Sequence, residues 1–255
     1  MASEARQSAL SVSDMMMIMA ARELKDGEVV FVGIGLPNQA CNLARALHGP
    51  NLVLIYESGA VGAVPVRIPP SIGDPALVTG SLMVCSMSDI FQLFLQGGKI
   101  HVGFLGGAQV DRFGNINTTV IGDYHHPKVR LPGSGGACEI AIHARRTLIV
   151  TPLGRRSFPE KVDFITSPGH RMHDKPRSHY KHPGAGPMKV ISDKAILEPD
   201  PKTGELTLTT LYPGVSVDDV KAGVSWPLAV SPNVVLASPP TAQEVEALRR
   251  VLARP

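Results

Sequence analysis

The chain has 255 residues, of which 44% are hydrophobic and 18% charged, and its formal net charge at pH 7 is +3. This composition is typical of a folded globular protein and excludes a largely disordered chain. The positive charge is small and dispersed, which argues against nucleic-acid binding but suits small anionic substrates. No apolar run reaches the roughly 18 residues of a membrane-spanning helix, and no signal peptide is indicated. We therefore expect a cytoplasmic protein without membrane contact.

The cysteines and histidines do not indicate a metal site. Cys41, Cys85 and Cys138 are far apart and form no Cys-x-x-Cys pair, so neither a zinc site nor a disulfide framework is predicted. The histidines between 170 and 182 lack the spacing with acids or cysteines that metal ligands show. We expect reduced thiols and no bound metal.

The first fifty residues predict a helix, a strand and a second helix. Ser13 is expected to cap the first helix, which runs over about 13–25. A strand over 28–32 and a helix over 37–47 follow. The turn between them, Gly33-Ile34-Gly35, lacks the third glycine of a dinucleotide-binding motif. It does offer backbone N–H groups at a helix start, which suit an anion or a developing oxyanion, and Gly35 is a candidate for that role.

The next strand ends in the main candidate for catalysis. Residues 52–56, Leu-Val-Leu-Ile-Tyr, form an uninterrupted apolar run that predicts a strand buried on both faces. Glu57 follows directly, and Gly59 lets the chain turn sharply. Open α/β sheets bind ligands at the carboxyl ends of their strands, so Glu57 is a candidate catalytic carboxylate. On position alone, a structural acid paired with a neighbouring Arg or Lys is the alternative.

The remaining elements continue the alternation of strands and helices. The Gly- and Pro-rich residues 59–80 predict a long irregular loop, and such loops are usually functional. Ser88 is expected to cap a helix over 89–96, and the glycine loop 133–137 to open a helix around 140–143. The other expected strands are 99–105, 116–121, 148–151, 188–192, 195–197 and 206–210, and Ser216 and Thr241 are expected to cap the last two helices. This order predicts a single α/β domain over 1–255, with an open, mostly parallel sheet and helices on both faces.

Residues 155–187 combine seven Arg and Lys residues with histidines and prolines. This segment is either a solvated basic loop, a subunit contact, or a contact for the phosphates of an anionic ligand. Its cations, or Arg67, are candidates for binding a substrate carboxylate.

Several motifs together resemble the β subunit of class I CoA-transferases, most closely those of glutaconate and 3-oxoadipate CoA-transferases. The resemblance spans roughly residues 13–250. It is carried by Val-Gly-Ile-Gly-Leu-Pro at 32–37, Tyr-Glu-Ser-Gly at 56–59, Phe-Leu-Gly-Gly-Ala-Gln-Val-Asp at 104–111, Ile-Gly-Asp-Tyr at 121–124 and Gly-Ser-Gly-Gly-Ala at 133–137.

This resemblance implies ping-pong chemistry on Glu57, through a mixed anhydride and a glutamyl-CoA thioester. A carboxylate nucleophile needs close positioning, and each tetrahedral intermediate needs N–H donors. Gly135, Gly136 and Ala137 are the candidates for that oxyanion role and for holding CoA, with plain turn geometry as the alternative. Coenzyme A thioesters enter as substrates, and no cofactor is expected.

The resemblance also implies a partner and a substrate class. In this family the active site lies between two homologous subunits or domains, so we expect a heterodimer or higher oligomer with a homologous α subunit. We expect that subunit to cover apolar residues of the loop after Glu57, such as Val61, Val64, Val66 and Ile68. We expect succinyl-CoA as donor and a dicarboxylate, 3-oxoadipate or glutaconate, as acceptor. Family members that lack the glutamate catalyse the decarboxylation or hydrolysis of CoA thioesters instead. The presence of Glu57 argues against that departure. The alternatives are a CoA-thioester hydrolase and a non-catalytic binding subunit.

Overall fold

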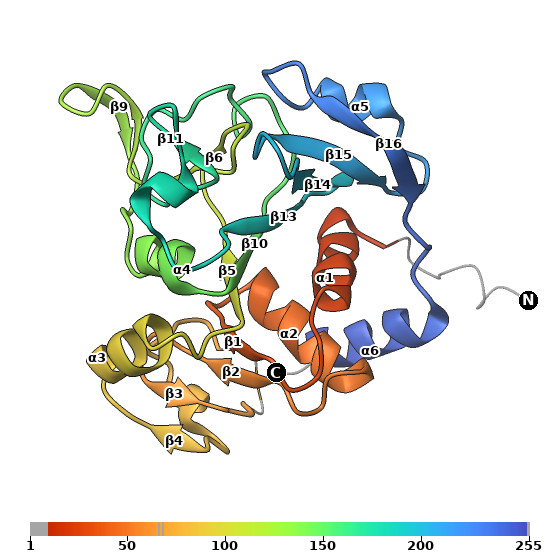
Figure 1. The fold of residues 1–255 in the computed structure, drawn as a ribbon. Helices are drawn as coiled ribbons and strands as arrows, with labels where there is room; N and C mark the ends of the chain where they lie inside the picture. Colours follow the sequence, from red (N-terminus) through yellow and green to blue (C-terminus); the bar gives the residue numbers. More distant parts are fainter. Residues whose placement is uncertain (1–9, 66, 68, 254–255) are drawn as a thin grey trace, which may run out of the picture.

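The computed structural model describes residues 10–65, 67 and 69–253. Ten strands form one sheet that crosses the whole molecule (Figure 1). Their order is β16 (Ala229–Leu236), β15 (Leu206–Leu211), β14 (Ala195–Pro199), β13 (Pro187–Ile191), β10 (Arg146–Val150), β5 (Val102–Leu105), β1 (Val29–Phe31), β2 (Val53–Ile55), β3 (Ala60–Val61) and β4 (Met83–Val84).

The centre of this sheet is parallel, as the sequence predicts. Strands β13, β10, β5, β1 and β2 pair in parallel, and antiparallel strands are added on both sides. Three small hairpins project from it: β6 (Gln109–Val110) with β7 (Ile116–Asn117), β8 (Val120–Gly122) with β9 (Pro127–Arg130), and β11 (Arg171–Met172) with β12 (Lys175–Pro176). The expected strand over 116–121 is thus two short strands, β7 and β8.

Helices cover both faces of the sheet, which confirms the predicted layers (Figure 1). On one face, α1 (Val12–Arg22), α2 (Leu36–Leu47) and α6 (Ala242–Leu252) pack on side chains such as Leu54 and Leu148. On the other face, η2 (Ile90–Gln96), α4 (Ala137–His143) and α5 (Val217–Lys221) pack on the alternate residues Ile55 and Ile149. The central strands are therefore buried on both sides, as parallel strands usually are.

The helix starts show where local prediction succeeds and fails. Ser216 and Thr241 cap α5 and α6 as predicted. The first helix, however, has Ser11 as its cap, two residues earlier than expected. Likewise Ser86, not Ser88, caps the short helix α3 (Met87–Asp89), which continues as the π-helix η2.

The segment after Glu57 is more ordered than predicted. It contains β3, the 3-10 helix η1 (Pro75–Val78) and β4, and β3 pairs antiparallel with both β2 and β4. Val61, expected to need a partner subunit to cover it, is already buried in β3 with 6% exposed surface. Val64 is 53% exposed. Val66 and Ile68, for which the same was expected, lie outside the described residues.

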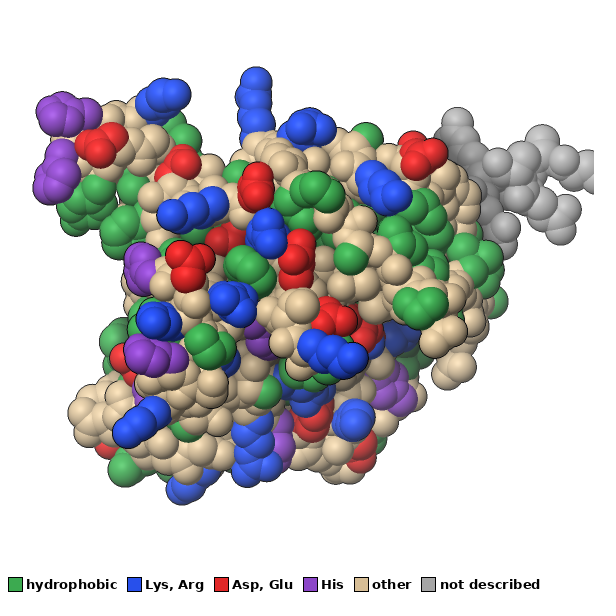
Figure 2. Space-filling model, turned by 45° about the horizontal axis from the view of Figure 1, so that its top comes forward, with side chains coloured by type: hydrophobic (Ala, Val, Ile, Leu, Met, Phe, Trp, Pro, Cys, Tyr) green, Lys and Arg blue, Asp and Glu red, His purple; other side chains and the backbone are tan. Residues whose placement is uncertain are grey.

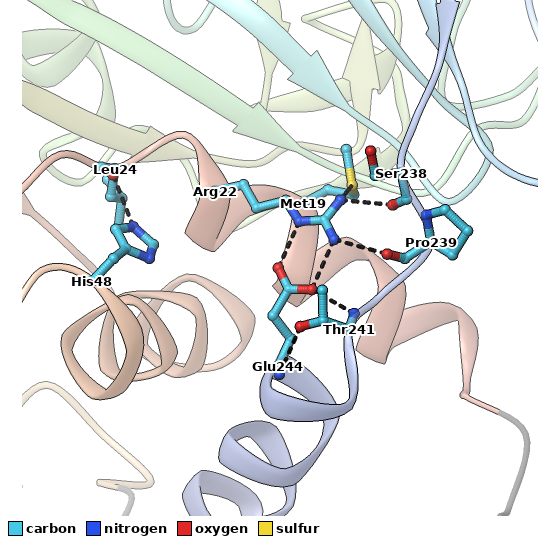
Figure 3. A network of polar contacts seen from close by, with 8 residues as sticks. All are labelled: Met19, Arg22, Leu24, His48, Ser238, Pro239, Thr241 and Glu244. Atoms are coloured by element: carbon cyan, nitrogen blue, oxygen red, sulfur yellow. Dashed lines mark hydrogen bonds and ion pairs between the residues drawn. The ribbon is translucent and has the colours of Figure 1, made fainter.

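The terminal helix is held to the first by one ion pair (Figure 3). The Arg22 guanidinium donates to both Glu244 carboxylate oxygens, at 2.7 and 2.8 Å, and also to the carbonyls of Ser238 and Pro239. Thr241 caps α6 and its backbone N–H donates to Glu244 as well. This bonding lowers the pKa of Glu244 from 4.5 to about 2.

Replacing Glu244 by Gln is expected to lower the free energy of unfolding by about 2 kcal/mol at pH 7. Solvent at the edge of the contact screens part of the interaction, so the loss is smaller than the pKa shift alone implies. The folded-state pKa is depressed, so the stabilisation is full above pH 4.5 and is lost as the pH falls from 4.5 towards 2. Urea unfolding across this range measures it. Glu246→Gln, which removes the exposed pair with Arg250, is the control and should change stability by less than about 0.5 kcal/mol.

Charged side chains are mixed over the face drawn in Figure 2, where Lys and Arg alternate with Asp and Glu and form no single basic patch. Within the described residues, no helix has the length and apolar character required to cross a membrane. All three cysteines are free thiols, and Cys41 is fully buried.

Candidate active site

Glu57 lies at the carboxyl end of β2, at the tip of the turn into β3. The Tyr56 N–H donates to the Ala60 carbonyl and the Gly59 N–H donates to the Tyr56 carbonyl, both at 3.0 Å. Gly59 has a φ of 110°, and a Cβ at this position would collide with the Cys85 carbonyl oxygen. Only glycine fits here. The turn presents the Glu57 side chain half-exposed at the edge of the sheet.

A cavity of 180 Å³ opens beside Glu57. Its walls come from the ends of β1 and β5, from the loop before α4, and from Ile72 in the segment that follows Glu57. The lining residues are Phe31, Val32, Gly33, Glu57, Ile72, Phe104, Leu105, Ser134, Gly135, Gly136, Ala137 and Ile140. Pockets that enclose a small organic ligand usually measure about 300–1,000 Å³, so this cavity has no room for a whole CoA thioester.

Among the glycines of this loop, Gly136 is the one whose added Cβ would lie within 4 Å of Glu57. A Cβ on Gly136 would lie 3.5 Å from the Glu57 Cδ and only 2.5 Å from Cζ of Phe91. Phe91 belongs to η2 and also packs against Phe31, with ring centroids 5.7 Å apart. Because Gly136 has no side chain, its backbone can approach the Glu57 carboxylate closely.

Some N–H groups of this loop have no hydrogen-bond acceptor in the described part of the chain and are candidates for binding an oxyanion. The Ala137 N–H donates to the Ser134 carbonyl at 2.9 Å, and the Cys138 N–H donates to Ser134 Oγ at 3.2 Å. In the described part of the chain, the N–H groups of Gly135 and Gly136 have no such acceptor. Ala137 lines the cavity as expected, but its N–H is already used, so Gly135 and Gly136 are the better donors of the predicted three.

The first glycine turn, residues 33–35, contributes to the cavity wall through a different residue from the one predicted. Gly33 lines the cavity, whereas Gly35 is not among the described lining residues. Gly35 instead directly precedes α2, with a φ of 75° that lets the chain enter the helix before Pro37. We therefore attribute its presence to backbone geometry at the start of α2.

A buried polar network supports the strand that ends in Glu57. The Asn38 side-chain amide donates to the Tyr56 hydroxyl at 3.0 Å, and Asn42 donates to the side chain of Asn38. Tyr56 is completely buried, and burial raises its pKa to about 12, so its hydroxyl stays neutral. This network ties the end of β2 to the first turn of α2.

Two of the cations expected to bind substrate are engaged elsewhere. Arg67 makes a bidentate pair with Asp74, at 2.7 and 2.8 Å. Arg177 is 8% exposed and donates to five backbone carbonyls, among them those of Ala141 and Ile142 in α4. Burial lowers its pKa to about 10, and it holds the 168–184 segment against α4. Neither arginine is a ready contact for a substrate carboxylate.

A larger hollow of 640 Å³ lies between Asp111, Phe113, Arg171 and Glu205. It shares no lining residue with the cavity at Glu57. Its Arg112 pairs with Glu160 and Glu205, each at 3.2 Å, and Asp111 accepts the N–H groups of the turn that follows it. These charged groups are engaged with one another or with the backbone, so we place the reaction at Glu57 despite the smaller volume there.

Three contributors to the site are not predicted by the sequence. Ile72 lies in a loop without periodicity, and the pattern around Phe91 predicts only a helix. Ser134 sits between two glycines, and its hydroxyl and carbonyl order the start of α4. A serine four residues before Cys138 is a local capping signal that could have been recognised.

The chain is similar to proteins of known function. The chain matches the Coenzyme A transferase family over residues 14–223. It is 50% identical over 247 residues to the B subunit of 3-oxoadipate CoA-transferase from Pseudomonas knackmussii, covering 97% of this chain and 95% of the relative. It is 38% identical over 231 residues to the B subunit of glutaconate CoA-transferase from Acidaminococcus fermentans, covering 89% and 86%.

The fold comparison gives the same family. The crystal structure of glutaconate coenzyme A-transferase from Acidaminococcus fermentans aligns with a TM-score of 0.87 and 33% identity, over 95% of this chain and 94% of that one. The family match spans most of the chain, and sequence and fold agree over nearly the full length of the relatives. The chain belongs to the coenzyme A transferase family.

Proposed function

We propose that this chain is the β subunit of a heteromeric CoA-transferase and that Glu57 is its nucleophile. The observation that carries the proposal is the position of Glu57: a carboxylate at a strand end, beside the side-chain-free backbone of Gly136. The N–H groups of Gly135 and Gly136, which have no acceptor in the described part of the chain, lie in the same loop. A nucleophile next to oxyanion donors is the arrangement that acyl transfer requires.

The reaction proceeds in two mirrored halves. A Glu57 oxygen attacks the thioester carbonyl of the donor, the C–S bond breaks, and an acyl-glutamyl anhydride and the CoA thiolate result. The thiolate attacks Cδ of Glu57, releasing the donor acid and leaving a glutamyl-CoA thioester. The acceptor carboxylate then attacks Cδ and expels CoA, which attacks the acceptor's acyl carbon and frees Glu57. No water is consumed, so the site must keep water out.

The N–H groups of Gly135 and Gly136 stabilise the oxyanion in these steps. Each attack creates negative charge on a former carbonyl oxygen, and donors already in place lower the barrier without reorganising. Tyr56 and Asn38 have a positioning role, because their hydrogen bond fixes the strand end that carries Glu57. A displacement of about 1 Å at the nucleophile is enough to cost on the order of a hundredfold in rate.

The partner is a homologous α subunit. The cavity of 180 Å³ encloses only the reacting groups, so a second surface must cover the rest of the CoA thioester. Two relatives are each named as the B subunit of their enzyme, which supports the same assembly for this chain.

The substrate proposal is succinyl-CoA as donor and 3-oxoadipate as acceptor, with glutaconate second. Its support is the higher identity to the relative from the 3-oxoadipate enzyme than to the one from the glutaconate enzyme. With the α subunit co-expressed, kcat/KM should be about tenfold higher for 3-oxoadipate, a difference that a few pocket contacts can produce. A strong preference for acetate would reject both dicarboxylates. Rapid loss of acyl-CoA without any acceptor would identify a hydrolase instead.

A further inference from the structure

The cavity beside Glu57 has a wall that is poor in polar side chains. Among the described residues that line it, Glu57 and Ser134 are the two with a polar side chain. The others contribute hydrocarbon, an aromatic ring or glycine backbone. An ionised carboxylate only accepts hydrogen bonds, whereas a hydroxyl also donates one. Within the described wall, Ser134 is therefore the side chain that can donate a hydrogen bond to a bound substrate.

The Ser134 hydroxyl is held in place, but its hydrogen is not used. The Cys138 N–H donates to Ser134 Oγ at 3.2 Å, and the Ala137 N–H donates to the Ser134 carbonyl at 2.9 Å. Ser134 is the acceptor in both bonds. A hydroxyl carries one donor hydrogen in addition to its lone pairs, and no group in the described part of the chain accepts this one. The oxygen is thus fixed at the start of α4 with a donor still available.

The turn that begins at Ser134 brings this donor close to the reacting carboxylate. The bond from the Ala137 N–H to the Ser134 carbonyl closes a four-residue turn, and the ends of such a turn lie within about 7 Å of each other. Gly136, inside the turn, is the residue whose added Cβ would lie 3.5 Å from Glu57 Cδ. The hydroxyl and the backbone of Gly136 therefore border the same end of the cavity.

The size of the cavity decides which part of the substrate reaches Ser134. A water molecule takes roughly 30 Å³ in the liquid, so a cavity of 180 Å³ holds about six non-hydrogen atoms. Counted from the thioester sulfur, these are the reacting carbonyl group and the acyl chain as far as its third carbon, with an oxygen on that carbon. The distant carboxylate of a dicarboxylic acid lies outside. An oxygen on the third carbon is thus the polar group of the acyl chain that the cavity encloses.

Such an oxygen has few other partners on this chain. The N–H groups of Gly135 and Gly136 are assigned to the oxyanion of the reacting carbonyl. Arg67 is paired with Asp74, and Arg177 donates to backbone carbonyls. Enclosing an acyl oxygen among apolar side chains without a hydrogen bond would be unfavourable.

We propose that the Ser134 hydroxyl donates a hydrogen bond to the 3-oxo oxygen of the acyl group and thereby selects 3-oxo acids as acceptors of CoA. This inference rests on the proposed function for the reaction at Glu57. Ser134 is a specificity-determining residue here, because it contacts an oxygen that takes no part in the transfer. An acid with a methylene group at the third carbon leaves the hydroxyl without an acceptor, and a site built around a hydrogen bond discriminates against such a substrate.

The test compares two acceptor acids on the αβ enzyme, with succinyl-CoA as donor. 3-Oxoadipate and adipate differ only at the third carbon, which is a ketone in the first and a methylene in the second. Ser134→Ala should lower the ratio of kcat/KM for 3-oxoadipate to that for adipate about tenfold, the usual effect of losing one neutral hydrogen bond. Ser134→Thr keeps the hydroxyl and should hold the ratio within about threefold of wild type.

The ratio is measured on one enzyme preparation, so a loss of folded protein cancels. Ser216→Ala is the matched control for removing a serine cap. Ser216 caps α5 and does not line the cavity, so its replacement should lower thermal stability and leave the ratio unchanged.

Three outcomes would overturn the inference. Equal losses for both acids in Ser134→Ala would assign the hydroxyl to the oxyanion, and no loss for either would leave Ser134 with a capping role alone. A wild-type enzyme that transfers CoA to neither acid would reject the substrate proposal together with this inference. Transfer to both acids with an unchanged ratio in Ser134→Ala would reject this inference alone.

Discussion

Replacing Glu57 by Gln is expected to lower kcat/KM for CoA transfer by at least about a thousandfold. The amide keeps the size and hydrogen-bonding capacity of the side chain but cannot attack a thioester. Because the glutamate is a covalent carrier in both halves of the reaction, no neighbouring group replaces it. Glu57→Asp should lose on the order of a hundredfold, because the shorter side chain misplaces the carboxylate by about an ångström.

The covalent intermediate gives a second measurement. Incubation of the αβ enzyme with succinyl-CoA alone should leave CoA bound to Glu57 as a thioester. Borohydride reduces that thioester to a primary alcohol and releases CoA, and peptide mass spectrometry should place the change at residue 57. A fully active Glu57→Gln enzyme, or a modified peptide elsewhere, would refute the assignment.

Glu139→Gln is a matched control for the loss of a carboxylate. Glu139 lies in the first turn of α4, close in sequence to Gly136, but its side chain bonds to His143 at 3.1 Å and to Gln96 at 3.3 Å. It does not line the cavity. Its replacement should leave transfer within about twofold of wild type, since exposed ion pairs contribute little.

The sheet and the position of Glu57 were predictable because their signals are local. An apolar run of five residues between turn signals is typical of a buried strand, and the acid after it must lie at the strand end. The four helices with capping boxes were also predictable in principle. Ser11, Ser86, Ser216 and Thr241 each precede an acid by three residues, and that acid returns a hydrogen bond to the cap. Ser13 and Ser88 lack such an acid, which is why those two predicted caps were wrong.

The walls of the cavity were not predictable because they depend on contacts between distant segments. Whether Gly33 or Gly35 lines the cavity beside Glu57 depends on the register of β1 against β2, which a single sequence does not specify. The composition of 155–187 places Arg177 among surface cations, but its donors are used by five carbonyls, three of them in residues 168–184 and two in α4. A basic segment thus contains a buried structural arginine.

Cooperation between the α4 loop and the π-helix decides how closely a substrate can approach Glu57. Phe91 fills the space where any side chain at residue 136 would lie, and Phe31 packs against its ring. π-helical segments are uncommon and often occur at functional sites. Here the π-helix brings an aromatic ring onto a glycine backbone and leaves the neighbouring carboxylate accessible from the cavity.

Gly136→Ala is expected to lower kcat about a hundredfold or more, with the protein still folded. The new methyl group would lie 2.5 Å from Phe91 Cζ and 3.5 Å from Glu57 Cδ, so the ring or the loop must move. A movement of the loop displaces the N–H donors from the oxyanion, and the loss of one such donor costs about 10²–10³ in kcat. A movement of the ring instead leaves the methyl group beside Glu57, where it obstructs the approach of the substrate. The stability cost should be about 1–3 kcal/mol, typical of overpacking.

A second substitution separates the steric conflict with Phe91 from the effect of a methyl group beside Glu57. Phe91→Leu removes the ring atom in conflict, so Gly136→Ala with Phe91→Leu should regain stability while kcat stays low, because the methyl group still lies beside Glu57. Gly154→Ala is the control for adding a methyl group to a glycine: its Cβ would meet only Ser157 Oγ, at 3.5 Å, and transfer should be unchanged. Stopped-flow measurement of CoA release and thermal unfolding give the two quantities. Wild-type kcat in Gly136→Ala would contradict the proposal that the reaction at Glu57 requires a backbone without a side chain at residue 136.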